Sequence, residues 1–464
     1  MTKPIPSQDF IEKHNRSQAA KEASKARKAK FESASVAKET ESKTHLALGS
    51  ATTVLSDEAI GAELRTVLTK LGEKKRVLAV PPDITRLNSK AGVLTGAVAA
   101  HYGPALVDVL PALGTHVPMT AAHIARMYPG VDPGLFRVHD WRNDVVTVGT
   151  LDADFVRTAT DGIWEKPWPA QLNRLVTAGG HDLVLSIGQV VPHEVAGMAN
   201  HAKNLFIGCG GAAGINESHF IGAAYGMERM MGRADTPVRR LLNEALRRFC
   251  AHQHVVFVLT VVGSDGKGGL VTRGLFIGEG PECFEKAAKL SLEVNFNLLA
   301  EAPKTVVAYL DPEEFHTTWL GNKAIYRTRM AIADGGELIV LAPGLRGFGE
   351  DKEIDRLIRA HGYRTTPEIM AKLDTHADLR ANLSAAAHLI HGSTENRFKV
   401  TYCPGHVTRA EIEGVGYGYG DLKTAMAKWQ PETLTDGWNV VHGERIFYVS
   451  NPALGLWAHR SRFT

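Results

Sequence analysis

Short apolar runs that end directly in glycine or proline loops recur along this chain, and they constrain its fold most. Residues 76–80 run into a proline pair, and residues 105–113 and 183–187 each run into a glycine. Each run has the length of a buried strand, and helix-like segments follow the loops. This alternation is typical of α/β proteins with largely parallel sheets. Ligands bind such sheets at the carboxyl ends of the strands, so a functional site is expected in these loops.

The 464 residues are too many for one ordinary hydrophobic core, and the strand pattern starts afresh near residue 300. Strand-like runs at 305–310 and 337–341 flank a predicted helix at 320–332. We therefore predict two α/β domains, residues 51–297 and 298–464, with the active site in the cleft between them. The chain end could pack back on the first domain.

Residues 1–50 differ from the rest because Ala, Lys, Glu and Ser dominate the stretch from Lys21 to Lys43. Such a stretch has helical propensity but little apolar surface to bury, which predicts a charged helical or flexible arm.

Composition excludes several functional classes. The formal net charge of +3 is too small to predict a nucleic-acid partner. No apolar run approaches the roughly 20 residues that a membrane span needs, and no signal-peptide core precedes the body. The four cysteines form no CxxC pair, so neither a zinc knuckle nor a disulfide framework is indicated. We expect a cytoplasmic protein with reduced thiols, a small-molecule ligand and no membrane partner; a homo-oligomer stays open.

The loops after the predicted strands carry reactive side chains. Arg86, in the sequence Pro82-Asp83-Ile84-Thr85-Arg86, offers a planar fork for a carboxylate or phosphate, although a surface ion pair with Asp83 would also explain it. His116 and His193 each lie at a strand end beside glycine or proline. Either imidazole could act as a general base or as a structural hydrogen-bonding group.

Three further positions add to this set. Lys203 stands beside apolar residues, where a lysine can become a nucleophile or an attachment point, although most lysines are solvated. His219 could ligate nickel or zinc, and His116, His193 and His219 together could instead form a zinc site. The glycine run from Gly208 to Gly214 fits neither a P-loop nor a dinucleotide-binding loop. A nicotinamide dehydrogenase is therefore disfavoured.

Taken in order, these motifs resemble the nickel-dependent lactate racemase superfamily. The resemblance covers most of residues 75–350. It rests on the ordered series Pro-Asp-x-Thr-Arg, Gly-Thr-His-x-Pro-Met and Pro-His, followed by Lys203 and His219.

The resemblance implies a nickel pincer nucleotide, a pyridinium-3,5-bisthiocarboxylic acid mononucleotide that holds nickel, as cofactor. It implies that Lys203 tethers the cofactor and that His219 ligates nickel. His116 and His193 would be the paired acid/base residues, and Arg86 would bind the substrate carboxylate. Lys323 and Trp319 would contribute to substrate binding from the second domain. Asp83 and Thr85 would order the Arg86 loop and contact the nucleotide.

The reaction implied is racemisation or epimerisation of a 2-hydroxy acid. The α-hydrogen beside an ionised carboxylate is very weakly acidic, so its removal as hydride, while a base takes the hydroxyl proton, avoids a dianion. The resulting 2-keto acid is planar, and hydride can return to either face. The two configurations direct their hydroxyls differently, which explains two histidines.

The chain departs from the lactate racemase pattern in two places. Lactate racemases have Ser-Gly-Gly before the lysine and Pro-Gly after it, where this chain has Ala-Asn-His-Ala-Lys203-Asn. Leu320 replaces a glutamine that commonly lies three residues before the second-domain lysine, and residues 315–319 are polar and aromatic. We therefore expect a larger, hydroxylated substrate such as an aldonate. A histidine-metal hydrolase and a non-catalytic cofactor carrier are the alternatives.

Overall fold

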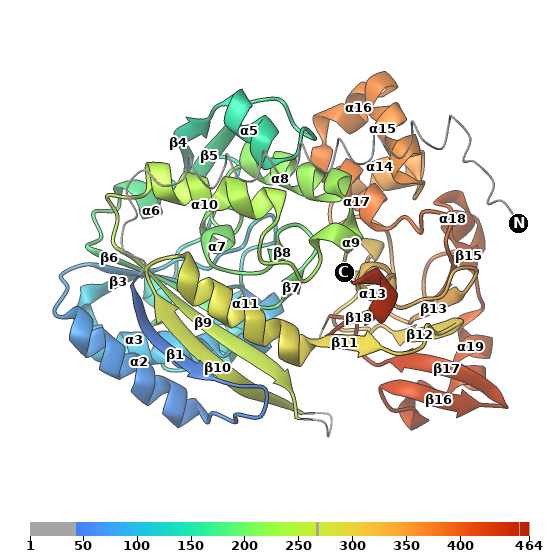
Figure 1. The fold of residues 1–464 in the computed structure, drawn as a ribbon, viewed down its shortest axis with the longest axis horizontal. Helices are drawn as coiled ribbons and strands as arrows, with labels where there is room; N and C mark the ends of the chain where they lie inside the picture. The colour runs from blue at the N-terminus through green and yellow to red at the C-terminus, as the bar shows by residue number, and fades with distance from the viewer. Residues whose placement is uncertain (1–42, 266–268, 454, 464) are drawn as a thin grey trace, which may run out of the picture.

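The first domain of the computed structural model is built around a mixed sheet (Figure 1). The structure describes residues 43–265, 269–453 and 455–463. The strand order is β1-β10-β9-β6-β2-β3, in which β3, β2, β6 and β9 are parallel. Strand β10 is antiparallel to both of its neighbours, so the edge strand β1 runs in the same direction as β9. The bounds are β1 Thr44–Gly49, β2 Val77–Val80, β3 Leu106–Val109, β6 Leu183–Gln189, β9 Val255–Ser264 and β10 Leu270–Gly278.

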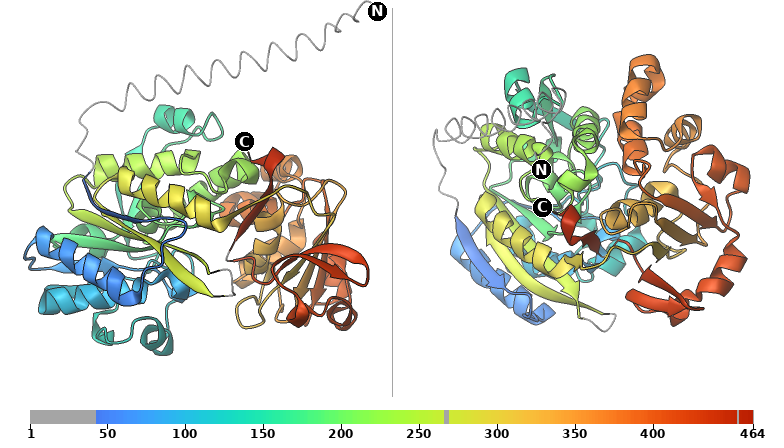
Figure 2. Two further views of the ribbon diagram at one scale, coloured as in Figure 1. Left: turned by 60° about the horizontal axis from the view of Figure 1, so that its bottom comes forward. Right: turned by 45° about the vertical axis from the view of Figure 1, so that its right-hand side comes forward.

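Helices cover both faces of this sheet, so its central strands are apolar on both sides (Figures 1 and 2). One face packs under α2 and α3, and α11 lies on the other face against β9 and β10. The helices of this domain are α2 Asp57–Leu71, α3 Ala91–Tyr102, α4 Ala121–Met127, α5 Ala153–Ala159, α6 Arg174–Ala178, α7 Ala202–Phe206, α8 Ala212–Tyr225, α9 Met227–Met230, α10 Pro237–Phe249 and α11 Pro281–Asn295. Two short hairpins complete it, formed by β4 Val145–Leu151 with β5 Trp168–Asn173 and by β7 Pro192–His193 with β8 Gly197–Met198.

The second domain repeats the α/β arrangement with the strand order β15-β14-β13-β12-β17-β16, parallel except for β16. Its strands are β12 Thr305–Tyr309, β13 Glu337–Ala342, β14 Lys399–Pro404, β15 Gly418–Tyr419, β16 Gly437–Val441 and β17 Glu444–Val449. Its helices are α12 Thr318–Gly321, α13 Lys323–Thr328, α14 Lys352–His361, α15 Thr366–Thr375, α16 Ala377–Ala381, α17 Leu383–His391, α18 Arg409–Gly414 and α19 Leu422–Trp429. The predicted fold class, two α/β domains with largely parallel sheets, is confirmed.

The predicted helix at 320–332 is shorter and divided. Asn322 separates α12 from α13, and its side-chain oxygen accepts a hydrogen bond from the Tyr402 hydroxyl at 2.8 Å. The chain turns away after Thr328 because Met330 bridges to Ala458 near the chain end. Tertiary contacts therefore override the local helical pattern here.

The chain end lies between the two domains. Strand β18 (Leu456–His459) pairs in parallel with β11 (Phe296–Leu299), which directly follows α11. We call the apolar group that it enters the interdomain cluster: Met227, Met231, Tyr326, Met330, Leu456 and Ala458. Both domains contribute to this cluster, so the chain end contacts each of them.

Most of the predicted arm lies outside the described residues, which begin at residue 43. Its last part is not an arm, because Thr44–Gly49 forms the edge strand β1 against β10. None of the helices in the described part of the chain combines the length and apolar character that a membrane crossing requires.

Candidate active site

A cavity of about 740 Å³ lies between the two domains and gathers all of the predicted site residues. The loops after β2, β3 and β6, together with α7 and α8, line it from the first domain, and α12, α13 and α17 line it from the second. The predicted residues on its wall are Asp83, Thr85, Arg86, His116, His193, Lys203, His219, Trp319 and Lys323. The carboxyl ends of parallel strands converge at one sheet edge, which explains why loops far apart in sequence meet here.

Asp83 organises the loop after β2. Its buried carboxylate accepts a hydrogen bond from the Thr85 hydroxyl at 2.5 Å and one from His116 Nδ1 at 2.6 Å. Burial alone would raise the pKa of Asp83, but His116, Thr85 and Arg86 outweigh it and lower that pKa. Because His116 donates from Nδ1, its Nε2 carries a lone pair and can accept a proton.

His193 has the opposite arrangement at its Nδ1. The backbone N–H of Val195 donates to His193 Nδ1 at 3.1 Å, so a neutral ring carries its proton on Nε2. Burial holds the pKa of His193 well below its usual range, and Lys203 and Arg86 add to this against the opposing charge of Glu194. His193 is therefore a neutral donor where His116 is an acceptor.

Lys203 lies on the short helix α7, which two strained residues precede. Asn200 and His201 have φ values of 66° and 57°, in the left-handed region that favours glycine. The side-chain oxygen of Asn200 accepts the His201 N–H at 2.7 Å, and the His201 ring packs 3.9 Å from the ring centre of Phe257. Buried Arg239 donates to the carbonyl of Asn200 at 3.0 Å. Side-chain contacts thus maintain a positive-φ conformation at two residues that are not glycine.

The environment of Lys203 makes its amine easier to deprotonate than that of an ordinary lysine. Burial, together with the charge of Arg86, lowers the pKa of Lys203 to about 8. A neutral amine is the nucleophilic form of lysine, which fits the predicted role as an attachment point.

His219 presents one ring nitrogen to the cavity. Its Nδ1 donates to the carbonyl of Ile215, one turn earlier on α8, at 2.7 Å. Burial lowers the pKa of His219 to about 4, so the ring is neutral and Nε2 has a free lone pair. Metal-ligating histidines commonly donate their other ring nitrogen to a carbonyl in this way.

A metal site made by protein groups alone is not present in the described residues. They include no group of three or more His, Cys, Asp or Glu side chains placed to hold a metal ion. The three-histidine zinc site of the alternative hydrolase would need such a group. One histidine is enough when the cofactor supplies the other donors, so the donor set fits a metal-carrying cofactor.

The second domain contributes a cation and an aromatic wall. Lys323 Nζ lies 3.9 Å from the Glu314 carboxylate and 5.6 Å from the ring centre of Phe315. Burial lowers the pKa of Lys323, and the charge of Arg86 acts in the same direction. The ring of Trp319 lies 4.4 Å from that of His388. Lys323 and Arg86 therefore present two positive charges to the cleft from opposite domains.

The polar residues of the cavity wall to which sequence reasoning gave no role include Glu194, His388 and His391. Glu194 directly follows His193, and its adjacency to a candidate base was a usable signal. His388 and His391 lie one turn apart on the apolar helix α17, where a local pattern indicates a buried helix rather than a site.

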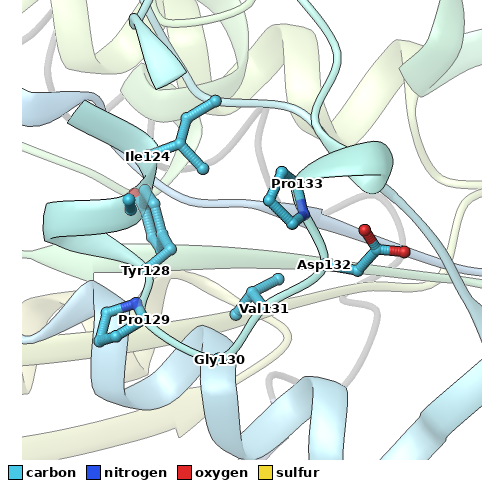
Figure 3. A pocket seen from close by; sticks show the side chains of 8 residues that line it. Ile124, Tyr128, Pro129, Gly130, Val131, Asp132 and Pro133 are labelled. Atoms are coloured by element: carbon cyan, nitrogen blue, oxygen red, sulfur yellow. The ribbon is translucent and has the colours of Figure 1, made fainter. Parts of the chain in front are cut away.

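A second pocket is apolar and carries no reactive group. Ile124, Tyr128, Val131 and Pro133 face one another across it (Figure 3). Its one carboxylate, on Asp132, accepts the Gly134 N–H at 2.9 Å and so caps a turn. The Tyr128 hydroxyl donates to the carbonyl of Pro82, so this region supports the Asp83 loop from behind.

Comparisons with known proteins agree with this geometry. The family model of the lactate racemase N-terminal domain matches residues 50–230. A crystal structure of a Thermotoga maritima protein is similar with a TM-score of 0.75 and 23% identity, over 89% of this chain and 100% of that one. The lactate racemase apoprotein from Thermoanaerobacterium thermosaccharolyticum has a TM-score of 0.65 and 17% identity, over 87% and 93%. No curated protein matches the chain. The resemblance indicated by the ordered motifs is confirmed.

Proposed function

Because residues 50–230 of this chain match the lactate racemase N-terminal domain, we propose that it is a nickel-dependent racemase or epimerase of a 2-hydroxy acid. The observation that carries this proposal is the pairing of His116 and His193 in one cavity with Lys203 and His219. The two acid/base candidates present a lone pair and a proton, respectively, at Nε2. A purely structural pair of histidines would not need to face a shared cavity.

The chain's own residues have distinct parts in this scheme. Arg86 and Lys323 bind the substrate carboxylate and keep it ionised. His116 takes the hydroxyl proton through Nε2, while Asp83 fixes the orientation of its ring and stabilises the imidazolium. His193 donates a hydrogen bond to the same substrate oxygen and supports the planar 2-keto acid. The opposite configuration directs its hydroxyl to His193, which would act as its base in the state in which Nε2 is unprotonated.

Lys203 and His219 would hold the cofactor. The Lys203 amine would join it as a thioamide, and His219 Nε2 would ligate nickel. When bound, the nickel pincer nucleotide would supply the group that accepts hydride and returns it to either face of the substrate.

A substrate larger and more polar than lactate fits the cleft. The cavity wall also carries polar side chains from both domains, including Glu194, His391 and Asn451. Lactate has only a methyl group to present to them. We therefore propose a sugar acid such as an aldonate as the substrate.

The decisive experiment combines cofactor analysis with turnover. Protein from a host that makes the cofactor should contain nickel and carry the cofactor mass at Lys203, and it should epimerise a 2-hydroxy acid. His116→Ala and His193→Ala should each lower kcat/KM by about 10² to 10⁴, the usual contribution of a general acid or base, while nickel content is retained. A protein that retains nickel but has no activity in the unmodified form would instead be a cofactor carrier.

A further inference from the structure

Glu194 is an ionisable residue of the cleft to which the scheme above gives no part in the reaction or in holding the cofactor. It follows His193 in the hairpin of β7 and β8, and its side chain keeps 20% of its surface exposed, at the cavity wall. The nearest ring nitrogen, His193 Nδ1, is 3.8 Å away, too far for a hydrogen bond. Among the described residues no other side chain donates to this carboxylate.

The Glu194 carboxyl is charged. Burial alone would raise its pKa, but the charge of Arg327 and a hydrogen bond from the residue's own backbone N–H act against burial, and the pKa lies well below its usual range. An ionised carboxylate can only accept hydrogen bonds, and its two oxygens can accept more than this one. The remaining acceptor positions of Glu194 are therefore open to a bound ligand.

His391 presents an unpaired polar group from the other domain. It is 4% exposed, lines the same cavity, and its Nε2 is buried without a hydrogen-bond partner. Burial lowers the pKa of His391 to about 3, so the ring is neutral and offers one donor and one acceptor.

The position of His391 is fixed by its helix. Helix α17 packs along α8, and the Ser384 hydroxyl donates to the Asn216 side chain across the domain boundary at 2.7 Å. His391 therefore faces the first domain in a defined place rather than on a mobile loop.

We propose that Glu194 and His391 bind hydroxyl groups next to the reacting carbon, so that the preferred substrates are polyhydroxylated monocarboxylic acids. This inference rests on the 2-hydroxy acid reaction proposed above and identifies the residues that select among such acids. Hydroxyls donate to the Glu194 carboxylate and exchange hydrogen bonds with the His391 ring. A dicarboxylic 2-hydroxy acid would place its second carboxylate beside Glu194 and be repelled. An alkyl chain would leave both groups unpaired, which is how a polar site rejects an apolar analogue.

Ligand binding to the cofactor-free protein tests the proposal without requiring turnover. Calorimetric titration would compare D-gluconate, L-lactate and L-malate on the unmodified protein, Glu194→Gln and His391→Ala. Glu313→Gln is the matched control, because Glu313 is an exposed carboxylate at the same cleft.

The unmodified protein should bind gluconate more tightly than lactate or malate. Glu194→Gln should weaken gluconate binding by about 10-fold to 100-fold, the range expected for a hydrogen bond to a charged group. The same substitution should weaken lactate binding far less. It should strengthen malate binding, because the repulsion between Glu194 and the second carboxylate of malate is removed. Glu313→Gln should leave the three affinities in their original order.

Three outcomes would overturn the proposal. The first is equal weakening of the binding of all three acids in Glu194→Gln, and the second is no preference for gluconate in the unmodified protein. The third is that Glu194→Gln leaves gluconate binding intact but has a lower nickel content when it is produced in a host that makes the cofactor, since Glu194 would then bind hydroxyls of the cofactor's ribose. Failure of the proposed function looks different: the acids would bind in the expected order, but cofactor-loaded protein would epimerise none of them.

Discussion

Lys203 shows how one side chain's environment sets its chemistry. Burial disfavours the charged form of Lys203 and lowers its pKa, whereas the carboxylates of Glu194 and Asp83 favour the charged form and raise the pKa. Burial prevails, and the pKa falls to about 8. A lysine with an ordinary pKa of about 10.4 is less than about 1% neutral at pH 8, whereas Lys203 would be about half neutral.

We therefore predict that acetylation of Lys203 by a limiting amount of acetic anhydride rises with pH along a titration curve whose midpoint is near 8. The sign follows from the chemistry, because only the deprotonated amine reacts and deprotonation increases as pH rises through the pKa. Peptide mass mapping of the cofactor-free protein at several pH values would measure this, with the exposed Lys286 as an internal reference. An acetylation midpoint for Lys203 well above pH 8 would contradict the prediction.

At the scale of single elements, the turn before α7 depends on Asn200. This side chain accepts the His201 N–H, and asparagine tolerates a positive φ better than most residues. We predict that Asn200→Ala lowers the free energy of unfolding by about 1 to 3 kcal/mol, since it loses that hydrogen bond and leaves a β-carbon in a strained conformation. Asn200→Gly loses the same hydrogen bond, but glycine adopts a positive φ without strain. Its loss of unfolding free energy should therefore be smaller. Urea unfolding of both variants would measure their free energies of unfolding. Equal losses in the two variants would contradict the idea that the turn is strained.

The sequence predicted the elements whose signals are local. Apolar runs ending in glycine or proline located β2, β3 and β6, and the polar residues after them, such as His116 and His193, line the cavity. The helix at 320–332 was overestimated because contacts of Asn322 and Met330 with distant residues interrupt it. His391 could not be identified as a cavity residue because only the docking of α17 on α8 brings it there. Such long-range packing is not encoded in local periodicity.

At the scale of the whole molecule, two domains must hold one cavity between them. The interdomain cluster performs this role near the site, since Tyr326 belongs both to that cluster and to the cavity wall. Tyr326 and Lys323 share helix α13, and Leu456 of β18 is fully buried in the cluster. The placement of Lys323 opposite Arg86 therefore depends on apolar packing contributed by the end of the chain.

We predict that Leu456→Ala destabilises the protein by about 2 to 5 kcal/mol, the cost of a large-to-small change in a core. Because the cavity it creates lies behind α13, the variant should also bind 2-hydroxy acids more weakly, which calorimetry would detect. Val440→Ala on the edge strand β16 is a matched control, since Val440 is 71% exposed and should change stability by less than about 0.5 kcal/mol. If Leu456→Ala lost stability but kept full ligand affinity, α13 would hold its position without the chain end, and the second domain alone would align Lys323 with the cleft.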